Sequence, residues 1–71
     1  MKIDKYVFKE LLKENKLTIT SFSVEIDMSR DTINNWLYRN CSIPEWRCEI
    51  IEEFFIEKSG YCPEELFLLE E

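Results

Sequence analysis

The stretch that decides the fold is residues 17–37, LTITSFSVEIDMSRDTINNWL. Thr18 and Ser29 are residue types that accept a hydrogen bond from an unpaired amide in the first turn of a helix, so each predicts a helix start. After each start, apolar or small residues recur at the spacing of one helical face: Ile19, Phe22, Ser23 and Ile26 in the first segment, and Ile33, Trp36 and Leu37 in the second. The stretch therefore predicts two short amphipathic helices, about 19–26 and 30–38, whose apolar stripes pack on each other.

Between these helices, Asp27 and Met28 leave room for only a short turn, with Met28 as an apolar plug. This is the layout of a helix-turn-helix, here about 18–38, in which the second helix reads DNA. The same stretch resembles the lambda-repressor-like (Xre/Cro-type) helix-turn-helix regulators of temperate phages. The residues that carry this resemblance are Leu17, Thr18, Phe22, Ser23, Ile26, Asp27, Met28, Ser29, Ile33 and Trp36.

Three positions depart from the family's pattern. Family members tend to have Gly where Asp27 stands, a polar residue where Ile19 stands, and Gly about three residues after Trp36, where this chain has Arg39 and Asn40. Because Asn tolerates the left-handed conformation that ends a helix, Asn40 is expected to replace that glycine. The resemblance implies a five-helix domain that binds operator DNA in a lysis-lysogeny-like genetic switch.

The remaining segments predict one all-α domain over residues 1–71, because one Gly and two Pro leave few breaks for β-hairpins. Helix one is expected from the cap Asp4 to Asn15, and helix four from a Ser42–Glu45 capping box to Ser59, before Gly60. A fifth helix is expected after Cys62-Pro63. The inner side of helix four is predicted to carry Ile43, Trp46, Ile50, Ile51 and Phe54.

Composition argues against several classes of function. The three cysteines form no CxxC pair and the chain has no histidine, which argues against a disulfide framework, a structural zinc site and any other metal site. The sequence also lacks a glycine-rich phosphate loop and a nucleophile elbow, so neither a cofactor nor an enzymatic activity is expected. No apolar run approaches the ~20 residues that a bilayer requires, which predicts a cytosolic protein, in a bacterial host according to the resemblance.

The net charge of −6 is unevenly distributed. Residues 1–16 hold five Lys and three acidic residues, whereas residues 41–71 hold nine Glu and two basic residues. The lysines of helix one are interpreted either as a solvated face or as contacts to a nucleic-acid backbone. The acidic C-terminal half is not the basic footprint that usually drives phosphate binding.

The outward face of the second motif helix and the loop after it supply the predicted DNA contacts. Arg, Asn and Asp can pair with guanine, adenine and cytosine, while Ser and Thr hydroxyls can contact phosphates. The alternative is that these residues are simply solvent-facing. The predicted DNA-binding residues are Ser29, Arg30, Asp31, Thr32, Asn34, Asn35, Tyr38, Arg39 and Asn40.

Several apolar residues are predicted to meet another protein chain. They are Ile19, Phe55, Ile56, Leu66, Phe67, Leu68 and Leu69. The four consecutive apolar residues at 66–69 cannot all face one core from one helix, and Ile19 is interpreted either as buried with Phe22 and Ser23 or as an apolar spot offered to a partner. In the family that the chain resembles, the C-terminal segment commonly carries a dimer contact, so a homodimer is one expectation. The rival hypothesis is an anti-repressor, or modulator of repression, that binds a partner repressor protein and alters its DNA binding. A small helical interaction module unrelated to gene control is a third.

Overall fold

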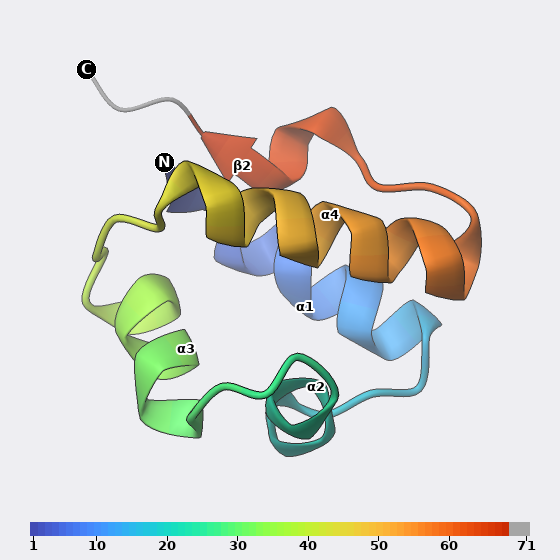
Figure 1. Cartoon of the computed structure of the whole chain (residues 1–71), viewed down its shortest axis with the longest axis horizontal. Coiled ribbons are helices and arrows are strands. Elements are labelled where there is room, and N and C mark those ends of the chain that lie inside the picture. The colour runs from blue at the N-terminus through green and yellow to red at the C-terminus, as the bar shows by residue number, and fades with distance from the viewer. Residues whose placement is uncertain (69–71) are drawn as a thin grey trace.

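Four helices and one pair of short strands make up the computed structural model, which describes residues 1–68 (Figure 1). The helices are α1 (Lys5–Glu14), α2 (Ile19–Glu25), α3 (Arg30–Tyr38) and α4 (Glu45–Ser59). Strand β1 (Lys2–Ile3) pairs with β2 (Phe67–Leu68), which follows the short 3-10 helix η1 (Glu64–Leu66). Among the described residues, no helix combines the length and apolarity that a bilayer crossing requires.

Short polar side chains start the first three helices. The Asp4 carboxylate accepts from the backbone N–H groups of Tyr6 and Val7, at 2.9 and 3.2 Å. Thr18 and Ser29 cap α2 and α3 through the amides of the third helical residues. These bonds satisfy amides that have no partner inside the helix, and they confirm the three predicted starts.

Backbone in the left-handed region ends each helix. Lys16, Asp27 and Asn40 have φ angles of 57°, 56° and 56°, and Gly60 has 84°. Asn40 therefore takes the role expected of it, and Asp27 adopts the conformation that a glycine would adopt more cheaply. The α2–α3 turn closes when the N–H of Met28 donates to the carbonyl of Ser23 at 2.9 Å.

Helix α4 differs from its prediction at both its start and its rotation. Pro44 occupies the cap position and no side chain caps the helix, so the Ser42–Glu45 capping box is wrong. Trp46 and Ile50, predicted to lie inside, are exposed, whereas Cys48 and Phe55 are buried. The inner side of α4 is set by the aromatic cluster beneath it.

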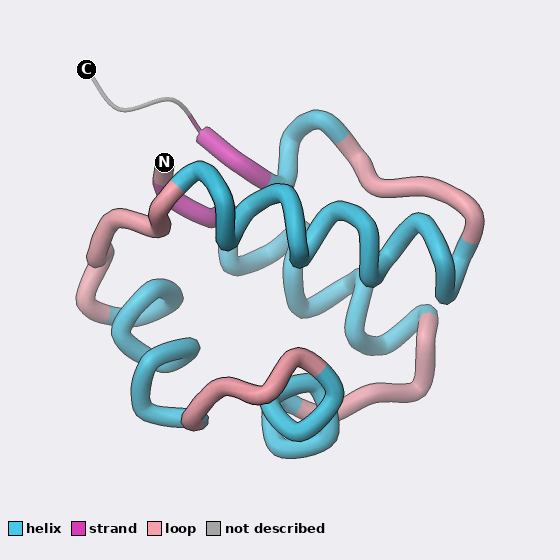
Figure 2. Tube along the Cα trace, in the orientation of Figure 1, coloured by secondary structure: helices cyan, strands magenta, loops and turns pink. Residues whose placement is uncertain are grey.

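Phenylalanines from three helices form that cluster. The Phe22 ring stacks on Phe55 with centroids 5.5 Å apart and meets the edges of Phe8 and Phe54 at 5.0 and 5.2 Å. Phe8, Phe22 and Phe55 are completely buried, and Trp36 lies in the same core. The cluster holds α1, α2 and α4 together, in the arrangement that Figure 2 shows.

The predicted fifth helix is wrong. The chain makes one 3-10 turn after Pro63, and Phe67 then becomes extended opposite Ile3, while the N–H of Asp4 donates to the carbonyl of Leu66 at 2.8 Å. Pairing with the first strand satisfies the backbone hydrogen-bonding groups of this segment. A contact with a distant part of the chain therefore outweighs the local preference for a helix.

The strand pairing and the aromatic cluster change the predicted protein interface. Leu66 and Phe67 are buried, as is Phe55, so these side chains build the core of the chain and offer no surface. Ile19 is half-buried against the same core, while Ile56 and Leu68 are exposed. Leu69 lies outside the described residues.

Candidate nucleic-acid interface

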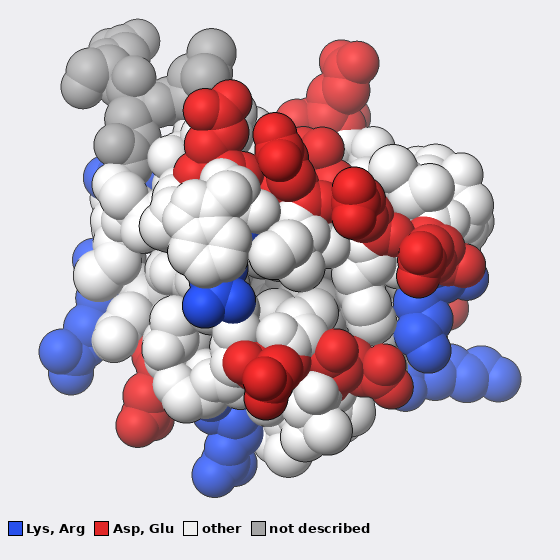
Figure 3. Space-filling model, in the orientation of Figure 1, with Lys and Arg blue, Asp and Glu red and all other residues white. Residues whose placement is uncertain are grey.

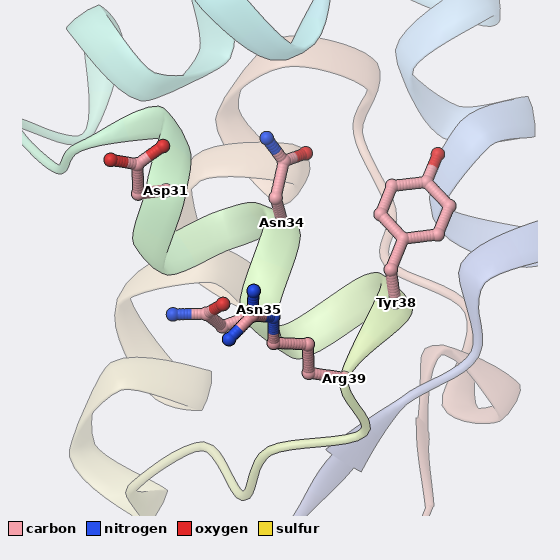
Figure 4. Close-up of a pocket in the computed structure, with 5 residues that line it drawn as sticks. All are labelled: Asp31, Asn34, Asn35, Tyr38 and Arg39. Atoms are coloured by element: carbon pink, nitrogen blue, oxygen red, sulfur yellow. The ribbon is translucent and has the colours of Figure 1, made fainter.

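One solvent-facing hollow on α3 gathers five of the nine predicted DNA-binding residues. The hollow has a volume of about 460 Å³, and we call it the α3 hollow. The cap Ser29 fixes the start of α3, and the burial of Ile33, Trp36 and Leu37 turns the opposite side of the helix to solvent. The residues that line the hollow are Asp31, Asn34, Asn35, Tyr38 and Arg39 (Figure 4).

The chemistry of the α3 hollow is mainly polar. Two amides and a carboxylate offer both donors and acceptors of hydrogen bonds, and the guanidinium of Arg39 offers donors in a planar fork. Asp31, Tyr38 and Arg39 are exposed, while Asn34 and Asn35 are half-buried. A lining of this kind suits the edges of bases, which also present alternating donors and acceptors.

The lysines of α1 lie beside one end of the α3 hollow. The ammonium groups of Lys5 and Lys9 lie 5.9 and 5.1 Å from the centroid of the Tyr38 ring, a distance at which a cation is attracted by the face of the ring. Figure 4 shows Tyr38 reaching toward α1. Spacing of four residues on α1 puts both cations on the same side of that helix, beside the candidate readout surface.

The other predicted DNA-binding residues take different places. Arg30 is exposed, and its guanidinium lies 3.5 Å from the hydroxyl of Thr20 on α2. Ser29 and Thr32 hydrogen-bond to each other at 2.8 Å and line a second hollow of about 430 Å³ near Trp46 and Arg47. Asn40 is exposed just after the end of α3. Its left-handed backbone conformation, which ends the helix, is enough to explain why Asn stands there.

Sequence reasoning placed the lysines of α1 on one side of the helix but did not place them next to Tyr38. Tyr38 and Lys5 are 33 residues apart in the chain, so only the folded structure, which brings these side chains together, shows the relation. The repeat of Lys at positions 5 and 9 was the one available signal.

The sequence matches no protein-family profile, no curated protein and no solved structure. A function for this chain therefore has to be inferred from its own geometry.

Proposed function

We propose that this protein is a transcriptional regulator that places α3 in the major groove of operator DNA. The observation that carries the proposal is the α3 hollow, in which the solvent face of α3 presents five polar side chains. An α-helix fits the major groove, where each base pair has a distinct pattern of donors and acceptors. Asn34 and Asn35 suit adenine, Arg30 suits guanine and Asp31 suits cytosine.

Cations beside the α3 hollow favour contact with the sugar-phosphate backbone. Lys5 and Lys9 flank Tyr38, and Arg39 lines the hollow itself. Contacts of this kind position a protein on DNA without reading its sequence. They also offset, locally, the repulsion expected from a chain with a net charge of −6.

A binding selection from random DNA duplexes, followed by mobility-shift titration of the enriched sequence, tests the proposal. We expect Arg30→Ala and Asn35→Ala each to weaken binding of the enriched site by ~1 to 3 kcal/mol, the range expected when one base-specific interaction is removed. Circular dichroism checks that both variants remain folded.

Lys58→Ala is the matched control. It removes the same charge as Arg30→Ala, but Lys58 lies near the C-terminal end of α4, far from α3 in Figure 1. We expect this variant to bind the enriched site nearly as the parent does. Failure to enrich any duplex, or equal losses for all three variants, would contradict sequence reading by α3.

A further inference from the structure

A groove between the end of α2 and the outer side of α4 combines an apolar floor with an acidic rim. Its volume is about 290 Å³. The floor consists of Ile26, Ile50 and Phe54, and the rim of Glu25, Asp27, Glu53 and Glu57. We call it the α2–α4 groove. In Figure 3 one group of acidic side chains lies along α4 and another over the end of α2, and the surface between these two groups is mostly uncharged, with basic atoms at one end.

Part of the floor is apolar surface left in contact with solvent, whereas Ile26 belongs to the buried core. Ile50 is 41% exposed, and Val24, the neighbour of Glu25 on α2, is 75% exposed. Phe54 is half-buried and fixed from below by the edge contact with Phe22. The core is already filled by Phe22, Phe55 and Ile51. Exposed apolar side chains on such a fixed base are typical of protein-binding surfaces.

The rim gives the α2–α4 groove a strong negative charge. Four carboxylates surround it, and none of the described residues that line it is basic. Lys58, next to Glu57 in the chain, has its ammonium 5.8 Å from the centroid of the Phe54 ring, so this ring already attracts a cation. Such a rim repels DNA phosphates and favours a basic partner.

The dimensions favour a helix as the occupant. Ile50 and Phe54 are one turn apart on α4, and the stretch from Ile50 to Glu57 is ~11 Å long at 1.5 Å per residue. That length matches about two turns of a second helix laid along α4. The volume is slightly below the ~300 to 1,000 Å³ of small-molecule pockets, so it suits one or two side chains that project from such a helix.

We propose that the α2–α4 groove docks a basic amphipathic helix of a partner protein. Leucine or phenylalanine side chains spaced three or four residues apart on that helix would fill the floor, and its lysines and arginines would face the four carboxylates. This inference does not depend on DNA binding, because the described residues that line the groove and those that line the α3 hollow do not overlap. Apolar contacts are expected to supply the affinity, and the ion pairs mainly the association rate.

The test uses the full chain, labelled with nitrogen-15, and a synthetic helical peptide of about four turns. The peptide carries leucines at i, i+3, i+4 and i+7 and lysines elsewhere. Its control has the same composition in an order without an apolar face. Titration followed by amide chemical shifts is expected to move the signals of Ile50, Phe54 and Glu25 with the amphipathic peptide alone.

Three variants sharpen the result. Ile50→Ser should lower the affinity for the peptide by about tenfold or more, as removal of a central apolar side chain does. Glu53→Lys combined with Glu57→Lys should slow association several-fold and remove most of its salt dependence. Ile56→Ser is the matched control, because Ile56 is 50% exposed on the same helix and does not line the groove. It should bind the peptide as the parent does.

Three results would overturn the proposal. The first is that no amide signal shifts at ~1 mM peptide, which would mean a binding free energy of about −4 kcal/mol or weaker. The second is equal binding of the scrambled peptide, or equal loss with Ile50→Ser and Ile56→Ser. The third is a concentration-dependent dimer in sedimentation experiments that involves the same residues, which would assign the groove to a second copy of the chain.

Discussion

Helices α3 and α4 expose two very different surfaces on one small core. The α3 hollow is lined mainly by polar side chains, including one carboxylate and one guanidinium, and by the ring of Tyr38, and two lysines lie beside it. The α2–α4 groove has three apolar side chains and four carboxylates. A net charge of −6 therefore does not describe the α3 side, and charge has to be assessed face by face before a partner is excluded.

The largest expected effect is unfolding of the core, which would destroy both surfaces together. Phe22→Ala should cost ~3 to 5 kcal/mol of unfolding free energy, because it empties the centre of the aromatic cluster. That loss is comparable to the whole stability of a small domain. Urea unfolding followed by circular dichroism should show a largely unfolded variant at room temperature. Cooperative unfolding near the parent midpoint would mean that the cluster does not support the helices.

Removal of the two lysines beside the α3 hollow should have a smaller effect, limited to DNA binding. Lys5→Ala combined with Lys9→Ala should weaken DNA binding equally for all sequences and reduce the slope of log affinity against log salt by ~1 for each phosphate that no longer meets a lysine. Anisotropy titrations at several salt concentrations measure this slope. Peptide binding at the α2–α4 groove should not fall. A change in sequence preference would show instead that these lysines act on base readout.

Backbone strain at the end of α4 should have a still smaller effect. Gly60→Ala places a β-carbon on a residue with a φ angle of 84°, yet nothing lies within 4 Å of that atom. Only the backbone conformation is penalised, and we expect a loss of about 1 kcal/mol of unfolding free energy. Thermal unfolding measures it. Both surfaces should keep their ligands. A loss of unfolding free energy well above about 1 kcal/mol would indicate that the segment after α4 also repacks.

The smallest effect concerns the carboxylates that face neither ligand. Glu49→Gln combined with Glu52→Gln should raise DNA affinity by no more than about twofold at 0.1 M salt, because exposed charges beyond ~10 Å are largely screened. Mobility-shift titration of the enriched duplex would detect any larger increase in affinity. A tenfold increase would place this side of α4 against DNA and remove the distinction between the two surfaces.

Local signals in the sequence predicted the local features correctly. Caps at Asp4, Thr18 and Ser29 and the left-handed residues Asn40 and Gly60 act within one turn of the helix that they begin or end. Helices α1 to α3 therefore begin where expected, and the polar face of α3 follows from the burial of Trp36 and its neighbours.

Features that depend on distant contacts were not predictable. Apolar residues occur on every side of α4, so periodicity could not choose between Trp46 or Ile50 and Cys48 or Phe55 as the buried set. The choice depends on Phe8 and Phe22 in other helices. The α2–α4 groove was missed for the same reason, because its floor contains residues assigned to the core. The strand at Phe67 requires Ile3, from the other end of the chain.

The three free cysteines differ in chemical accessibility. Cys41 is exposed in the segment that joins α3 to α4, and Cys48 is buried. Burial raises the pKa of the half-buried Cys62 thiol to about 11, so at neutral pH it supplies almost no reactive thiolate. A maleimide dye at neutral pH should therefore attach at Cys41, in the segment between α3 and α4. The unsubstituted chain thus carries one attachment point for a fluorophore, from which energy transfer can report whether a labelled duplex and a labelled peptide are bound at the same time.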